Sequence, residues 1–258
     1  MAILHVPHSY SNHSDINIRQ VNIVAPLRWL ADGINDFRVA PITSMLYGMV
    51  FAVIGMLILM MSNSYPAFTL AAISGFFLIG PFVAIGLYDM SAQIANGNQP
   101  SLIHATRHIR FNTISVVSFA FIITFIFVFW ARFTAILTSV LFNNADLATE
   151  GWISIFVSEG NTELMLTFML TGLGLAILVF TISVVAVPMM TDRKIDVITA
   201  MFTSIRAVKK NILPMILWAG LLVAMIGLGI VTFYIGLIVT LPIIGHASWH
   251  AYQDLVND

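Results

Sequence analysis

The chain has 258 residues, of which 9% are charged and 59% are apolar, and its formal net charge is -1. A soluble globular domain is about a quarter charged, so this chain could not surround itself with a solvated surface. The near-zero charge excludes the basic surface of a nucleic-acid binder. The lack of cysteine excludes disulfides and thiolate metal sites. We therefore expect an all-α, polytopic helical membrane protein.

Two parts are predicted along the chain. Residues 1–25 form a polar cytoplasmic tail without the apolar core of a cleavable signal peptide, and residues 26–258 form a single helical membrane domain. A helix that crosses a bilayer needs about 20 mostly apolar residues. This criterion predicts six transmembrane helices in three hairpins, at residues 42–62, 66–88, 112–130, 164–190, 212–230 and 232–248.

The last apolar run, residues 212–245, needs separate treatment. As one helix it would extend about 50 Å, whereas the hydrocarbon core of a bilayer is about 30 Å thick. We expect two short helices that turn near Gly227, Gly229 and Thr232. A single tilted or kinked helix is the alternative.

The positions of Lys and Arg predict the orientation in the membrane, because these residues are enriched in cytoplasmic loops. With six spans, only Arg132 falls on one side. The other side carries the remaining ten, which are Arg19, Arg28, Arg38, Arg107, Arg110, Arg193, Lys194, Arg206, Lys209 and Lys210. Both termini are therefore expected in the cytoplasm.

Helical apolar spacing recurs in the cytoplasmic segments and predicts helices lying in the membrane interface. One stripe is Leu27, Leu30, Ile34 and Phe37, and another is Ile195, Ile198, Phe202 and Ile205; polar residues, among them Asp32, Asp36, Arg38, Asp196, Arg206 and Lys209, occupy the opposite faces. Residues 101–111 form a weaker copy. Each segment precedes a hairpin whose second span carries a proline: Pro81, Pro188 and Pro242.

Two of these hairpins also share a glycine pattern, since residues 48–55 align with residues 220–227. We consider three copies of an interfacial helix plus a hairpin, or a chance alignment of apolar helices. The glycines in the spans, including Gly48, Gly55, Gly220 and Gly227, favour close helix packing over a pore lining.

The middle of each predicted span lacks Asp, Glu, Lys, Arg and His. Ion-coupled transporters usually keep such a residue at membrane depth, and an intramembrane hydrolase needs one for acid–base work. We therefore expect a protein that is not an enzyme and has no catalytic residues.

Histidines provide the candidate site chemistry. His246 and His250 are spaced i, i+4, as are His104 and His108, so each pair lies on one face of a helix. With Asp89, the pair His246 and His250 could bind a transition metal or a haem iron.

Other roles are open for the same residues. The rings of His246, Trp249, His250 and Tyr252 could anchor a helix end at the headgroups, and Asp89 and Asp192 could cap the helices that follow them. Asp89 could also pair with Arg107 or Arg110. His5, His8 and His13 lie in the predicted tail.

Several stretches resemble an uncharacterised bacterial family known as a domain of unknown function in predicted inner-membrane proteins. These are residues 29–33 with Asp36, residues 80–91, residues 191–193 with Asp196, and the closing Gly-His-Ala-Ser-Trp-His-Ala-Tyr run at 245–252. The likeness extends from about residue 19 to residue 256. It implies a bacterial inner membrane and a loose link to respiration, but it does not imply an activity.

Three functions are compatible with these features. The first is a non-enzymatic accessory or scaffold subunit, in contact with lipid and other membrane-protein subunits but not with nucleic acid. The second is a metal- or haem-binding protein that uses His246 and His250. The third is a channel or facilitator for a neutral or lipid-like solute.

Overall fold

The structure, a computed structural model, describes residues 16–61, 84–100, 112–141 and 162–257. These residues are helical apart from connecting segments and one short ribbon, which confirms the predicted all-α class. The helices are α1 (Ala25–Val39), α2 (Pro41–Met61), α4 (Ile85–Ala95), α6 (Thr113–Leu141), α8 (Thr162–Ser183), α9 (Ala186–Asp192), α10 (Val197–Lys210), α11 (Ile212–Val231) and α12 (Leu237–Leu255). In the ribbon, β1 (Asn17–Ile18) pairs antiparallel with β2 (Val256–Asn257).

Of the described helices, four are long and apolar enough to cross a membrane: Pro41–Met60, Thr113–Phe133, Leu166–Asp192 and Ile212–Val231. They coincide with four of the six predicted spans. The predicted span 66–88 lies mostly outside the described residues, and its described end is the start of α4. The predicted span 232–248 falls mainly on α12, which is not among the four because its second half is polar. The six-span arrangement is thus confirmed only for these four.

The last apolar run is two helices joined by a turn, so the single-helix alternative is wrong. Phe233 and Tyr234 have positive φ angles of 53° and 65° in this turn. The Thr232 hydroxyl accepts a hydrogen bond from the Gly236 N–H at 2.9 Å and donates to the Leu228 carbonyl at 3.1 Å. The turn near Thr232 is therefore as predicted, but Gly227 and Gly229 lie inside α11.

A second break divides the predicted span 164–190 into α8 and α9. Pro188 has no N–H, so the carbonyl of Val184 loses its helical donor and the helix is interrupted just before α9. Ser204 of α10 supplies partners at the break. Its hydroxyl donates to the Thr181 carbonyl at 2.7 Å and accepts from the Val185 N–H at 3.2 Å.

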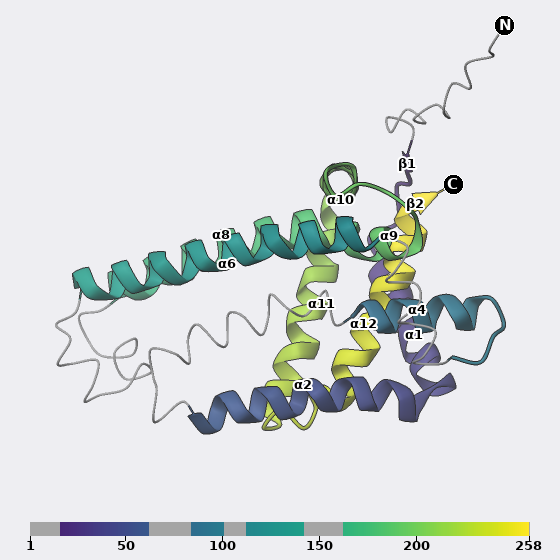
Figure 1. The fold of residues 1–258 in the computed structure, drawn as a ribbon, viewed down its shortest axis with the longest axis horizontal. Coiled ribbons are helices and arrows are strands. Elements are labelled where there is room, and N and C mark those ends of the chain that lie inside the picture. Colours follow the sequence, from purple (N-terminus) through teal and green to yellow (C-terminus); the bar gives the residue numbers. More distant parts are fainter. Residues whose placement is uncertain (1–15, 62–83, 101–111, 142–161, 258) are drawn as a thin grey trace, which may run out of the picture.

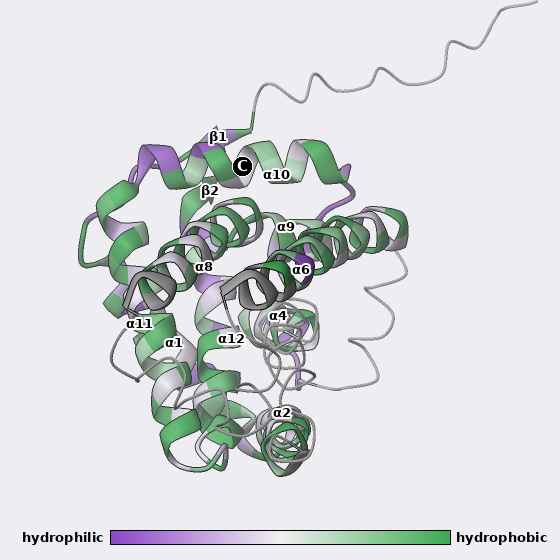
Figure 2. Ribbon diagram, turned by 90° about the vertical axis from the view of Figure 1, so that its left-hand side faces the viewer, coloured by the Kyte–Doolittle hydropathy of each residue, from purple (hydrophilic) through white to green (hydrophobic). Residues whose placement is uncertain are grey.

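The long helices run in two main directions. Figure 1 shows α6 and α8 side by side along the long axis, with α2 running the same way on the opposite side, while α1, α11 and α12 run across them. The same three long helices are seen end-on in Figure 2. Because α11 crosses the direction of α2, α6 and α8, the four candidate spans do not share one axis.

The core is centred on α12, which packs against α1, α2, α4 and α11. Trp29 of α1 and Trp218 of α11 meet edge to face, with ring centroids 5.8 Å apart. Gly33 allows α1 to approach α12, because a Cβ there would lie 2.6 Å from the backbone nitrogen of Ala247. Both ends of the described chain meet in the ribbon and therefore lie on the same side of the molecule.

Helices α1 and α10 form in two of the three segments predicted to be amphipathic, and the third, residues 101–111, lies outside the described residues. The faces that α1 and α10 bury differ from the predicted apolar stripes. In α1 the buried side includes Trp29, Gly33 and Asp36, whereas Leu27 is 52% exposed. In α10 the buried residues are Ala200, Thr203, Ser204 and Ala207, while Ile198 and Phe202 are each 62% exposed. On α10 small residues thus pack inward, because they permit close helix contact.

Candidate functional site

A buried polar layer lies where α1, α2 and α4 meet the second half of α12. At its centre is His246, whose side chain is fully buried. The Ser44 hydroxyl of α2 lies 3.0 Å from its Nε2, and the Ser91 hydroxyl of α4 lies 2.7 Å from its Nδ1. A neutral imidazole has one N–H donor and one acceptor nitrogen, and a hydroxyl can serve either. Both ring nitrogens are therefore satisfied inside the chain.

One helical turn later, His250 is hydrogen-bonded to a residue of α1. Its Nε2 lies 2.8 Å from Oδ2 of Asp36, whose side chain is buried in α1. The sequence placed Asp36 on an outward polar face, which is wrong. A polar side chain can be buried when it has a hydrogen-bond partner, and the partner here is a residue 214 positions away in the chain.

Asp89 of α4 is also buried. It accepts a hydrogen bond from the Gln93 side-chain amide, at 2.5 Å, one turn along the same helix. The predicted pairing with Arg107 or Arg110 lies outside the described residues, as do His104, His108 and the tail histidines. Asp89 lies inside α4, where it caps no helix end.

No group of three or more His, Asp or Glu side chains comes together for a metal ion among the described residues, which include His246, His250 and Asp89. His246 is held by two serines, His250 by Asp36, and Asp89 has its own partner. A metal at this set would have to displace these hydrogen bonds. Metal or haem binding here stays a prediction, and the geometry favours a structural role for the two imidazoles.

Tyr252 links the end of α12 to the end of α9. Its hydroxyl donates to the Asp192 carboxylate at 2.6 Å and accepts from Nε of Arg193 at 2.9 Å. Burial raises the pKa of Tyr252 well above its usual value, and the Asp192 carboxylate raises this pKa further. The phenol therefore stays a proton donor. Asp192 was expected to cap a helix, but the N-cap of α10 is Asp196, which accepts from the Thr199 N–H at 2.9 Å.

The run 245–252 is explained almost wholly by internal contacts. Trp249 is 5% exposed and packs against the Tyr252 ring, with centroids 5.5 Å apart. A Cβ at Gly245 would lie 2.4 Å from the Leu87 side chain. The rings of His246, Trp249 and Tyr252 thus lie in the interior of the chain, which does not fit the alternative of headgroup anchors for them.

Two further ties were not predicted from the sequence. Asp254 accepts from Arg28 and from the Trp29 indole N–H, which fixes the end of α12 on α1. Asn211 is buried and bonds both the Val21 N–H, at 2.8 Å, and the Arg19 carbonyl, at 3.0 Å. Single polar residues of this kind leave no periodic signal in a sequence.

Comparison with known proteins gives one match. Residues 68–192 match the model of a family described as "Predicted integral membrane protein (DUF2189)". This confirms the resemblance over these residues, which contain the stretch 80–91; the run 245–252 lies beyond them. No curated protein and no solved structure matches the chain.

Proposed function

We propose that this integral membrane protein is a non-enzymatic accessory or scaffold subunit of a bacterial inner membrane. The observation that supports a non-enzymatic role is the pairing inside the polar layer. Ser44 and Ser91 hold His246, and Asp36 holds His250. A catalytic acid, base or nucleophile must reach a substrate, whereas most of these side chains are buried and bonded to one another.

The surface that a scaffold would offer to a partner lies on α6. Phe121, Phe125 and Phe129 are 75%, 69% and 62% exposed. Their i, i+4 spacing places them on one face of the helix. Aromatic side chains bury large areas and pack well edge to face, so this stripe suits an apolar helix of another subunit within the bilayer.

The partner can be tested by photo-crosslinking in native membranes. A photoreactive amino acid replaces Phe125, and a control replaces Val223 of α11, which is 72% exposed. We expect a discrete protein adduct from position 125 and none from position 223. If purification in mild detergent repeatedly yields the chain alone and position 125 captures only lipid, the scaffold proposal fails.

The polar layer can be tested separately by metal analysis. Purified protein and the double variant His246→Ala/His250→Ala are compared by elemental analysis and visible absorption. A structural layer predicts substoichiometric metal and no haem in both. Near-stoichiometric metal or haem that disappears in the variant would instead establish the metal-binding function.

The orientation that we propose has both ends of the chain in the cytoplasm. The pairing of β1 with β2 brings the ends together, and Arg206 and Lys210 bond carbonyls next to them. Basic residues favour the cytoplasmic side. Because the chain has no cysteine, single Lys209→Cys and Arg132→Cys variants report the two sides directly. An impermeant maleimide should label position 132 in spheroplasts, and position 209 only after lysis; the reverse pattern would invert the orientation.

A further inference from the structure

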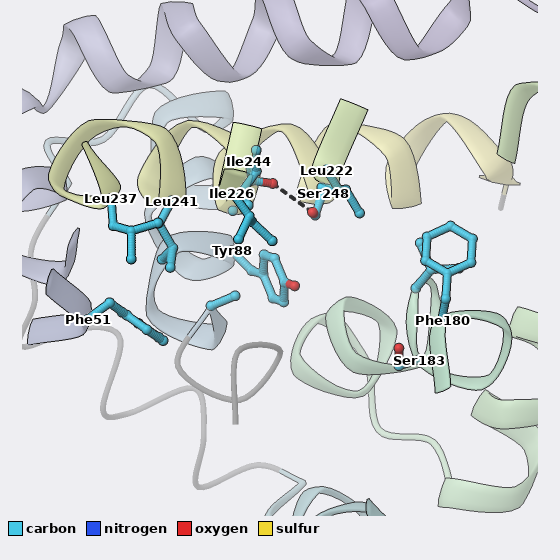
Figure 3. Close-up of a pocket in the computed structure, with 13 residues that line it drawn as sticks. Phe51, Tyr88, Phe180, Ser183, Leu222, Ile226, Leu237, Leu241, Ile244 and Ser248 are labelled. Carbon is cyan, nitrogen blue, oxygen red and sulfur yellow. Dashed lines mark hydrogen bonds between the residues drawn. The ribbon is translucent and has the colours of Figure 1, made fainter. Parts of the chain in front are cut away.

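A pocket of about 200 Å³ lies between α2, α4, α8, α11 and α12 (Figure 3), and its lining includes none of the paired side chains of the polar layer. It exceeds the roughly 150 Å³ of an apolar cavity that is able to bind benzene. The space is therefore large enough for a ring or a short length of hydrocarbon chain.

The walls of the pocket are apolar and uncharged. Most lining residues are aliphatic or aromatic, and among those that the structure describes there is no Asp, Glu, Lys, Arg or His. Burying a charge without a partner is costly, so a ligand must be neutral in the part that enters. Phe51, Phe180, Leu222 and Ile226 come from candidate spans, which gives a ligand dissolved in the bilayer a route to the pocket.

Hydroxyl groups mark one part of this lining. Ser183 at the end of α8 lines the pocket and is 7% exposed. Tyr88 is 5% exposed, and Figure 3 shows its hydroxyl pointing toward the side of the pocket where Ser183 lies. Ser248 is hydrogen-bonded to the Tyr88 hydroxyl and donates to the Ile244 carbonyl at 2.6 Å. A serine hydroxyl can both donate and accept hydrogen bonds, so an oxygen of a ligand in the pocket would find a partner at Ser183.

We propose that the pocket binds the chain of an uncharged membrane lipid, with an ester or hydroxyl oxygen of the lipid hydrogen-bonded to Ser183. The hydrocarbon then lies along Leu237 and Leu241, on the side of the pocket away from Ser183 (Figure 3). This lipid site goes beyond a scaffold role. A variant that no longer binds the lipid should still contact a partner subunit through α6.

The probe is a monoacylglycerol with a diazirine and an alkyne in its acyl chain, added to protein in vesicles of phosphatidylethanolamine and phosphatidylglycerol. After illumination, labelling is quantified by in-gel fluorescence and located by peptide mass spectrometry. We expect adducts on α8, α11 and α12. Ser183→Ala should lower labelling roughly fivefold, the value of one hydrogen bond. Thr171→Ala on the same helix, whose hydroxyl bonds the Thr167 carbonyl, should not change it.

Two further comparisons test the pocket itself. Ile226→Trp should fill it and suppress labelling, while Leu228→Trp, at a position 60% exposed, should not. A fatty acid with the same photoreactive chain should label less, because its carboxylate is charged. Equal labelling of Ser183→Ala and Thr171→Ala, or of the two tryptophan variants, would overturn the proposal. If Ile226→Trp does not fold, the conservative Ser183→Ala comparison still decides.

Discussion

Gly48→Ala should loosen the contact between α2 and α12. An alanine Cβ at this position would lie 2.4 Å from the carbonyl oxygen of Ile238, 2.6 Å from its Cα and 2.7 Å from its carbonyl carbon. All three are backbone atoms, so no side-chain rotation can relieve the overlap. Non-bonded heavy atoms rest about 3.5–4.0 Å apart, and the two helices would therefore have to separate by about 1 Å.

The free-energy cost of this overlap can be isolated by comparison with Gly220→Ala, the same exchange in another candidate span. A Cβ at Gly220 meets no described atom within 4 Å. Both variants gain up to about 1 kcal/mol of helix propensity, and this term cancels in their difference. Overpacking costs about 1–3 kcal/mol, so the free energy of unfolding should be lower for Gly48→Ala than for Gly220→Ala by about that amount.

The measurement is reversible unfolding in mixed micelles, titrated with sodium dodecyl sulfate and followed by tryptophan fluorescence. Trp29 and Trp218 are buried on α1 and α11, beside α12, and report on this part of the core. Equal free energies for the two glycine variants would refute the close contact between α2 and α12. A reversed order would mean that α11 is the more tightly packed span.

Three other variants test the polar contacts. Ser91→Ala leaves a nitrogen of the buried His246 ring without its partner at 2.7 Å, and should lower the unfolding free energy by about 1–3 kcal/mol; an unchanged value would contradict the contact. Tyr252→Phe removes hydrogen bonds to a carboxylate and a guanidinium, and in the same titration should cost about 1.5–3 kcal/mol. Asn211→Ala releases the segment after Arg19, so trypsin should cleave there about tenfold faster, as expected for a loss of about 1.4 kcal/mol; cleavage at the wild-type rate would show that other contacts hold the segment.

The proposed repeat gains no support from its glycines. Gly48 packs against the start of α12, where a Cβ would meet Ile238, and Gly55 packs against the turn between α11 and α12, where a Cβ would meet Tyr234. At the aligned positions Gly220 and Gly227, no described atom lies within 4 Å. Two segments can share a sequence pattern and still present it to different surroundings.

The sequence by itself determined the class of protein and the position of four candidate spans, because apolar length and the scarcity of charge are local properties. It also located the turn near Thr232. The run 245–252 contains His246 and His250, which the sequence proposes for a site, and both lie in the polar layer.

Only the tertiary structure decided which face of each helix is buried and which polar groups meet. The sequence pattern placed Asp36 outward, and nothing local indicates that His250, 214 residues away, would hold it inside. The partners of His246 come from two other helices. Hydropathy is a property of each segment, whereas burial of a charged or polar side chain depends on a partner that the fold brings from elsewhere in the chain.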